Sequence, residues 1–222
     1  MSYIEIDSRK IGLEYPPYIV AEISGNHGGK LEKVFELIDS ASNCGANAVK
    51  IQSYTPDTMT LNSKRKDFIL TEGLWKGYNL YELYKVAHTP FEWHKEIFSY
   101  ASKKGITLFS TPFDESAFEL LEDLNCPAYK IASFENHDLK LIKKVASSNK
   151  PLIISTGMAD LKTIEESIET AKENGNGQLC ILHCVSGYPT LTEEFNLKTI
   201  KDLSKRFNVQ VGLSDHSKNN LA

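Results

Sequence analysis

The chain has 222 residues, of which 24% are charged and 41% hydrophobic, and its formal net charge is −4. This length is sufficient for one sizeable α/β domain. The acidic balance, with no basic stretch that outweighs its acidic neighbours, argues against a nucleic-acid partner. No apolar run approaches the roughly 20 residues of a membrane helix, and the N-terminus lacks the apolar centre of a signal peptide. We therefore expect no membrane partner and a cytoplasmic location.

The first predicted element is a small hairpin over residues 4–15, ahead of the first strand of the main sheet and at its floor. Seven apolar runs follow, each ending in small or polar residues. They cover residues 18–24, 48–54, 106–113, 128–133, 151–157, 179–186 and 209–216. Because these runs are continuously hydrophobic rather than alternating, they are typical of parallel strands covered by helices.

Helical periodicity separates most of these runs. The predicted helices cover residues 30–43, 91–104, 115–124, 161–173 and 196–207. Seven βα repeats indicate a (β/α)₈ TIM barrel rather than an open doubly wound sheet. No eighth strand can be found after the seventh, and a barrel lacking a strand would expose two unpaired edges. We therefore expect residues 1–222 to be an incomplete TIM-barrel domain, truncated after strand seven of a longer protein.

One predicted connection, residues 54–90, is far longer than the others. Such a long connection in a compact domain is usually functional, and its aromatic residues could cover a ligand. The alternative is an additional helix that packs Tyr81, Leu83 and Tyr84 into the core.

The four cysteines lie in or beside apolar segments and have no paired spacing. They are predicted to be small buried thiols rather than ligands of a zinc site or partners in disulfides. The four are Cys44, Cys126, Cys180 and Cys184.

In (β/α)₈ barrels, the active site lies at the C-terminal ends of the strands. The polar residues at the predicted strand ends are Glu22, Asn26, His27, Lys50, Gln52, Ser110, Thr111, Lys130, Ser133, Glu135, Ser155, Thr156, His183, Ser186, Ser214, Asp215 and His216. Lys50 and Lys130 are the most informative, because an ammonium group inside apolar strands is costly unless it meets an anion or a carboxylate. They indicate a phosphate or carboxylate site, with hydroxyl groups nearby to complete it. The alternatives are ion pairs with Glu22 or Glu135, and a Schiff base on Lys130.

His216, after Ser214 and Asp215, could be a metal ligand, a general base or a hydrogen-bonded core residue. A metal would require further ligands, and His183 on the adjacent strand end is the local histidine candidate. His88, His94 and His137 are interpreted as surface or packing residues.

Seven motifs, in this order, resemble the sialic acid synthase family, which condenses phosphoenolpyruvate with an amino-sugar aldehyde. They are YIVAEISGNHGG, ANAVKIQSYTPDTMTLN, FSTPFD, AYKIASFE, LIISTGM, CVSGYPT and VGLSDHS. Residues 74–93 look most like the branch that acts on 2,4-diacetamido-2,4,6-trideoxy-L-altrose. The branches that make N-acetylneuraminate or legionaminate are the alternative. A Schiff-base aldolase using Lys130 and a non-catalytic binding remnant are hypotheses of other classes.

The resemblance implies roles for individual residues. The expected catalytic residues are Glu22, which holds a water on a metal, Lys130 and Glu135. The expected phosphoenolpyruvate-binding residues are Lys50, Thr111, Lys130, Ser133, Ser155, Ser186 and Ser214, although many relatives have asparagine in place of Ser186. The expected sugar-binding residues are Gln52, Glu135 and Tyr188.

The resemblance also implies a divalent metal, with manganese as the expected ion. His216 matches one of the family's two histidine ligands, and the second is expected beyond residue 222, so His183 is not its equivalent. The family's C-terminal antifreeze-like domain has no match in this chain. In relatives that domain reaches across a domain-swapped homodimer, which is the expected assembly of the full-length protein.

Overall fold

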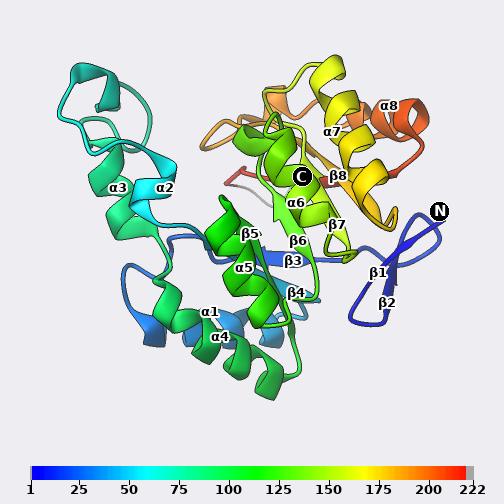
Figure 1. Ribbon diagram of the computed structural model, residues 1–222, viewed down its shortest axis with the longest axis horizontal. Coiled ribbons are helices and arrows are strands. Elements are labelled where there is room, and N and C mark those ends of the chain that lie inside the picture. Colours follow the sequence, from blue (N-terminus) through cyan, green and yellow to red (C-terminus); the bar gives the residue numbers. More distant parts are fainter. Residues whose placement is uncertain (1, 219–222) are drawn as a thin grey trace. The chain divides into compact units, whose positions relative to one another are not determined.

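The computed structural model describes residues 2–218, which form two compact units (Figure 1). The first unit is Tyr18–Pro127. The second unit combines the residues up to Pro17 with those from Ala128 onward.

The first unit contains three parallel strands in the order β3-β4-β5, each followed by helix. The strands are β3 (Val20–Glu22), β4 (Ala48–Ser53) and β5 (Thr107–Pro112), and the long helices are α1 (Leu31–Asn43), α4 (Phe91–Lys104) and α5 (Glu115–Asp123). Helices α1 and α4 cover one face of these strands, where Val34, Val49 and Ile97 are fully buried. The observed order strand, helix, strand confirms the predicted βα repeats of this half of the chain.

The bounds of α4 match the prediction because the sequence carries a signal at each end. Pro90 stands at the N-cap, and Gly105 ends the helix in the left-handed region at φ 69°. Glycine adopts this conformation without the steric cost that a Cβ imposes.

The long connection between β4 and α4 contains α2 (Pro56–Met59), a 3₁₀ turn at Lys66–Phe68 and α3 (Leu80–Ala87). Figure 1 shows α2 and α3 together at one side of this unit. Helix α3 has no buried residue. The alternative in which Tyr81, Leu83 and Tyr84 enter the core is therefore wrong, since all three are half-buried. Tyr84 instead packs edge-on against Tyr54, with ring centroids 5.8 Å apart.

The second unit contains a hairpin and four parallel strands in the order β6-β7-β8-β9. The strands are β1 (Ile4–Ile6), β2 (Arg9–Ile11), β6 (Tyr129–Ile131), β7 (Leu152–Ser155), β8 (Leu179–Cys184) and β9 (Gln210–Ser214). The helices are α6 (Leu139–Ala146), α7 (Leu161–Asn174) and α8 (Lys198–Phe207), with 3₁₀ turns at Ser133–Glu135 and Thr192–Glu194.

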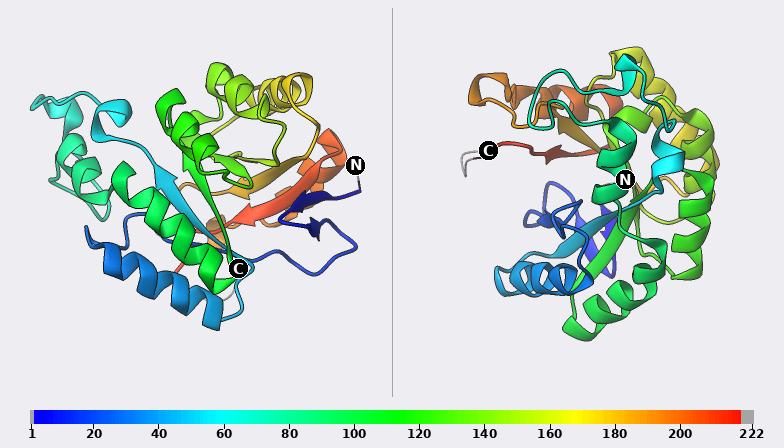
Figure 2. Two further views of the ribbon diagram at one scale, coloured as in Figure 1. Left: turned by 60° about the horizontal axis from the view of Figure 1, so that its bottom comes forward. Right: turned by 90° about the vertical axis from the view of Figure 1, so that its left-hand side faces the viewer.

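The predicted hairpin is confirmed as β1-β2, and it lies at the start of β8. The backbone N–H of Glu5 donates to Oε1 of Gln178 at 2.8 Å, one residue before β8 begins. Figure 2 shows the hairpin beside the N-terminal part of β9. The hairpin is therefore at the opposite strand ends from the candidate site described below.

Helix α6 was not among the predicted helices, although its sequence carries the usual signals. Asp138 caps it by accepting a hydrogen bond from the backbone N–H of Leu141 at 3.0 Å. Ile142 and Val145 are buried on its inner face. The apolar positions follow helical periodicity, but the helix has only eight residues, so its pattern is short.

Three cysteines are buried, as predicted, but Cys44 is exposed at the C-cap of α1. The prediction was wrong for Cys44 because α1 ends there and the chain turns at Gly45 with φ 82°.

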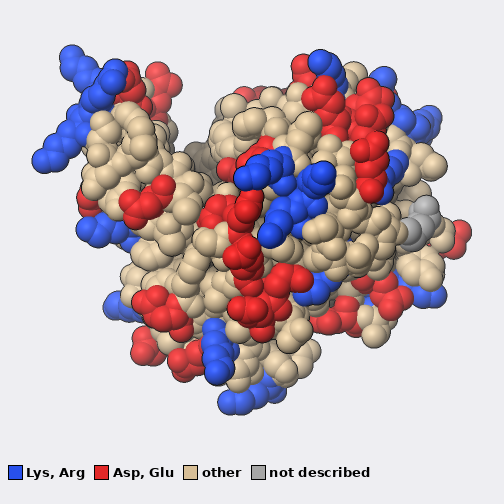
Figure 3. Space-filling view, viewed as in Figure 1, with Lys and Arg blue, Asp and Glu red and all other residues tan. Residues whose placement is uncertain are grey.

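No helix in the part of the chain that the structure describes is long and apolar enough to cross a membrane. Over α7, acidic and basic side chains are interspersed (Figure 3).

Candidate functional site

The register of the strands in the first unit places four predicted site residues on one face. Glu22 pairs with Lys50, and Gln52 pairs with Thr111. Partners in a parallel register project to the same face, and so do residues two apart on one strand. These residues are called the first cluster; they are Glu22, Lys50, Gln52 and Thr111.

Lys50 is the centre of the first cluster and is only 6% exposed. Its Nζ forms an ion pair with Glu22 and donates a hydrogen bond to Oγ1 of Thr111 at 3.1 Å. The ion-pair alternative for Lys50 is therefore present in the structure. The Glu22 side chain, however, is 39% exposed, so solvent or a ligand can reach it. An anionic ligand would compete with Glu22 for the same ammonium group.

Gln52 is held at the edge of the first cluster. Its Oε1 accepts a hydrogen bond from Oγ of Ser24 at 3.2 Å, and the Ser24 backbone N–H donates to Glu22 at 3.0 Å. The side-chain NH₂ of Gln52 therefore has donors to offer a polar ligand.

In the second unit, the register also gathers the predicted residues on one face. Ser155 pairs with Leu182, and Cys184 pairs with Ser214. Lys130 pairs with Ile153, which lies two residues before Ser155. Lys130, Ser155, Cys184 and Ser214 consequently share a face, at the C-terminal ends of their strands.

Two further serines join this face from the loops that follow β6 and β8. The hydroxyl groups of Ser133 and Ser186 both lie against Gly157, in the turn after β7. Cys184 Sγ lies 3.8 Å from Ser186 Oγ. These residues, with Glu135, Tyr188 and His216, are called the second cluster. Its members are Lys130, Ser133, Glu135, Ser155, Cys184, Ser186, Tyr188, Ser214 and His216.

Glu135 has the most perturbed carboxyl group of the second cluster. Burial raises its pKa to about 7, against the opposing effects of a backbone hydrogen bond and of the Lys130 charge. Among the described residues, its Oε2 is buried with no hydrogen-bond partner, as is Oγ of Ser155. Because buried polar atoms are normally hydrogen-bonded, both are ready to bind a polar ligand.

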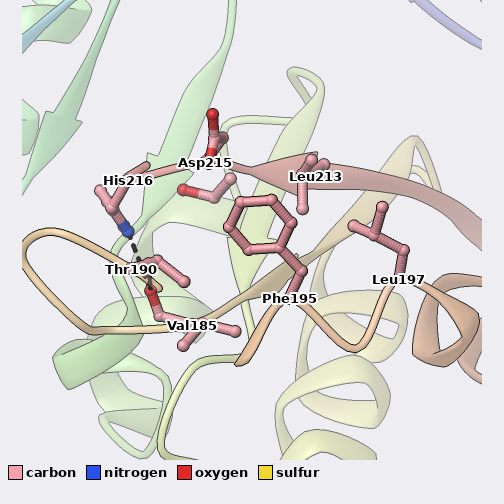
Figure 4. A pocket seen from close by; sticks show the side chains of 8 residues that line it. Val185, Thr190, Phe195, Leu197, Leu213, Asp215 and His216 are labelled. Carbon is pink, nitrogen blue, oxygen red and sulfur yellow. Dashed lines mark hydrogen bonds between the residues drawn. The ribbon is translucent and has the colours of Figure 1, made fainter. Parts of the chain in front are cut away.

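His216 lies just after the end of β9, and its ring contacts the loop that follows β8 (Figure 4). Its Nδ1 is 3.1 Å from the Val185 carbonyl oxygen and 3.9 Å from Cys184 Sγ. The ring of Tyr188 packs on it, with centroids 4.4 Å apart. The interaction with Cys184 raises the pKa of His216, against the effect of burial. Burial raises the pKa of Cys184, but His216 and the hydroxyls of Ser133 and Ser186 outweigh it and lower the pKa to about 7.

The geometry of His216 fits one ligand of a metal. A carbonyl oxygen only accepts, so Nδ1 carries the proton toward Val185 and Nε2 retains its lone pair. Within residues 2–218, however, no three histidine, cysteine, aspartate or glutamate side chains are gathered to hold a metal ion. The described residues therefore fit a single metal ligand and not a complete site.

His183 is not a partner for His216. It is adjacent to Cys184 on β8 and so projects to the opposite face, where its Nε2 donates to the Phe195 carbonyl oxygen at 2.8 Å. The interpretation of His183 as the local histidine candidate is wrong, because side chains alternate along a strand.

Two residues were not predicted as site residues, namely Cys184, a member of the second cluster, and Asn136, which contacts that cluster. Cys184 was interpreted only as a buried thiol. It lies two residues after Leu182, the partner of Ser155, so it projects to the same face, and its own partner on β9 is Ser214. Asn136 is 1% exposed and donates from Nδ2 to the Ser155 carbonyl oxygen at 2.8 Å. No sequence signal marks this contact, because it joins the turn after β6 to the end of β7, 19 residues along the chain.

The parallel βα repeats, with lysine and hydroxyl side chains at the strand ends, define an α/β protein of the (β/α)₈ barrel class. The chain belongs to the NeuB family, whose model matches residues 37–222. This match confirms the resemblance to sialic acid synthases that the motifs indicate.

The relatives make the resemblance more specific. The chain is 48% identical over 200 residues to a pseudaminic acid synthase of Campylobacter jejuni, an alignment covering 90% of this chain and 58% of that protein. It is 48% identical over 202 residues to the pseudaminic acid synthase of Helicobacter pylori, covering 91% and 59%. The chain thus spans less than two thirds of the length of these synthases.

A solved structure confirms the predicted fold class. An N-acetylneuraminic acid synthetase from Leptospira borgpetersenii, in complex with citrate, matches with a TM-score of 0.86 at 30% identity. The match covers 98% of this chain and 71% of that one.

Proposed function

We propose that the full-length protein condenses phosphoenolpyruvate with 2,4-diacetamido-2,4,6-trideoxy-L-altrose, forming pseudaminic acid and releasing phosphate. The observation that carries the proposal is that each cluster places a lysine on one face with at least one hydroxyl group at strand ends. The 48% identity to two pseudaminic acid synthases supports the choice of sugar.

Phosphoenolpyruvate carries a phosphate and a carboxylate, so two ammonium groups suit it. We assign Lys50 and Thr111 of the first cluster to this substrate, because they already form a hydrogen-bonded pair. From the second cluster we assign Lys130, Ser133, Ser155, Ser186 and Ser214. Charge-assisted hydrogen bonds of this kind are shorter and stronger than those between neutral groups.

Gln52, Glu135 and Tyr188 are assigned to the sugar. Tyr188 is 43% exposed and Gln52 keeps its NH₂ donors, so both are accessible to a ligand. With a pKa of about 7, Glu135 can both give and take a proton near neutral pH, as a general acid–base group requires.

The reaction joins C3 of phosphoenolpyruvate to the aldehyde carbon of the open-chain sugar, and the aldehyde oxygen takes a proton to become a hydroxyl. Water adds to C2 and loses a proton. Phosphate then departs with the bridging oxygen as the C2–O bond breaks, while the new hydroxyl group on C2 forms the C=O bond of the ketone and passes its proton to phosphate. Lys50 and Lys130 hold the two anionic groups throughout, and the burial of Lys50 strengthens its effect. Glu22, which is exposed beside Lys50, is assigned to hold a water on the metal.

The proposal includes a divalent metal, with manganese as the expected ion and Nε2 of His216 as one ligand. When bound, such an ion would polarise the aldehyde oxygen as a Lewis acid. The domain-swapped homodimer and the cytoplasmic location rest on the sequence resemblance and on composition and stay predictions.

Two alternatives lead to different experimental outcomes. N-acetylneuraminate or legionaminate synthesis would use the same chemistry with another sugar. A Schiff-base aldolase would use Lys130 as the nucleophile and no metal, and borohydride with pyruvate would then trap that lysine covalently. Lys130 shares its face with Ser155 and Ser214, and these hydroxyl groups favour anion binding over imine chemistry.

The decisive experiment measures phosphate release by the full-length protein from phosphoenolpyruvate with each of three sugars. These are the altrose derivative and the sugar precursors of N-acetylneuraminate and of legionaminate. The assay is run with manganese and with a chelator. We expect release with the altrose derivative and loss of activity with the chelator. Release with none of the sugars, or borohydride trapping of Lys130 without phosphate release, would contradict the proposal.

A further inference from the structure

Gly157 occupies the turn after β7 at the point where three loops of the second cluster meet. Gly157 is buried. The hydroxyl groups of Ser133 and Ser186 lie on the side of its Cα from which a side chain would project. An ideal Cβ built there would meet Ser186 Oγ, would lie 2.7 Å from Ser133 Oγ and would lie 3.2 Å from the Cys184 carbonyl oxygen. The two hydroxyl groups therefore occupy the space that any other residue would fill.

The backbone of Gly157 does not itself require glycine. Its φ lies outside the left-handed region, in contrast to Gly45 and Gly105. An alanine would thus meet no conformational penalty from φ, and its only conflict would be with its neighbours. Two of these neighbours are serine hydroxyls, which can rotate away, whereas the third is a backbone carbonyl oxygen on β8, whose tight contact a shift of a few tenths of an ångström relieves.

We infer that Gly157 is a positioning residue for the phosphoenolpyruvate site, because its missing side chain lets the hydroxyls of Ser133 and Ser186 converge on one oxyanion. This inference rests on the proposed function and extends it to a residue that makes no polar side-chain contact of its own. A methyl group at Gly157 would push both hydroxyls into other rotamers, removing two hydrogen bonds to the ligand while leaving the strands intact.

The test is Gly157→Ala in the full-length protein, with Gly187→Ala as the matched control. A Cβ at Gly187 would have its nearest neighbours at 3.5 Å, which is ordinary contact, and this glycine lies in the next strand-end loop. We expect Gly157→Ala to raise KM for phosphoenolpyruvate at least about tenfold, as loss of one charge-assisted hydrogen bond or more implies. KM for the sugar and the thermal unfolding midpoint should stay close to the wild-type values, and Gly187→Ala should change none of the three.

A second background separates positioning from folding. In Ser133→Ala/Ser186→Ala the hydroxyls are gone, so adding Gly157→Ala should neither weaken phosphoenolpyruvate binding further nor lower the unfolding midpoint. Calorimetric titration with phosphoenolpyruvate supplies this readout even if the single variant folds poorly. The inference is overturned if Gly157→Ala binds phosphoenolpyruvate as the wild type does, or if the substitution weakens binding equally in both backgrounds. Wild-type protein that binds no phosphoenolpyruvate would instead overturn the proposed function on which the inference rests.

Discussion

At the scale of single residues, Glu135 is the carboxyl group whose environment most alters its chemistry. Burial raises its pKa from 4.5 to about 7, so the folded protein holds this proton more tightly than the unfolded chain does. Stability contributed in this way is fully present below pH 4.5 and is lost as the pH rises toward 7. The ionised form is costly because Oε2 is buried without a partner among the described residues.

The substitution Glu135→Gln removes this titration, since glutamine keeps a similar shape and carries no charge. Relative to wild type, the variant should therefore gain stability between pH 5 and 7.5, by on the order of 2 kcal/mol. Urea unfolding of the full-length protein at several pH values measures the difference. Glu165→Gln, at an exposed position on α7, is the matched control for the substitution itself. A difference for Glu135→Gln that does not change with pH would show that burial does not perturb this carboxyl group.

The site residues that lie at the ends of strands could be predicted from the sequence. Lys50 and Thr111 were expected together, and their hydrogen bond follows from one face of β4 and β5. The interpretation of His183 failed because alternation along β8 was not applied to it. The convergence of Ser133 and Ser186 on Gly157 could not be predicted, because it depends on how three loops pack.

At the scale of secondary structure, a buried hydrogen-bond network connects α4 to the neighbouring strands. Ser53 Oγ on β4 lies 2.7 Å from both Nε2 of His94 and Oγ of Ser110 on β5. Nδ1 of His94 lies 3.0 Å from the Pro90 carbonyl oxygen. Since that carbonyl only accepts, Nδ1 carries the proton and Ser53 donates to Nε2. All three side chains are fully buried, so this network fixes the end of β4 that carries Gln52.

Replacing His94 with phenylalanine should destabilise the protein by about 2 kcal/mol. The ring is of similar size, but two hydrogen bonds are lost and buried polar groups of Ser53 and Pro90 lose a partner. Denaturant unfolding of the full-length protein measures this. His137→Phe, at an exposed position, is the control and should change the stability by less than about 0.5 kcal/mol. Equal stability of the two variants would show that the network contributes nothing.

The secondary structure elements were predicted best where the sequence marks both ends. Helix α4 has a proline at its start and Gly105 at its end, and its bounds agree with the prediction. Helix α6 escaped prediction because eight residues give little more than two turns of periodicity. The connection over residues 54–90 was recognised as unusual, but its apolar residues did not reveal that α3 would bury none of them.

At the scale of the whole molecule, the family and the fold class are established, and the activity of the full-length protein is the proposal. The chain covers 58% of the length of the Campylobacter synthase. Each of the two units of this chain supplies a lysine that shares a face with at least one hydroxyl group at strand ends. The account depends on both lysines acting on the same substrate.

A crystal structure of the full-length protein with phosphoenolpyruvate tests this dependence most directly. We predict that Nζ of Lys50 and Nζ of Lys130 each lie about 2.8 Å from an oxygen of the ligand, as charge-assisted hydrogen bonds require. Phosphoenolpyruvate bound elsewhere, with Lys50 still paired to Glu22 and Lys130 directed at Glu135, would contradict the account.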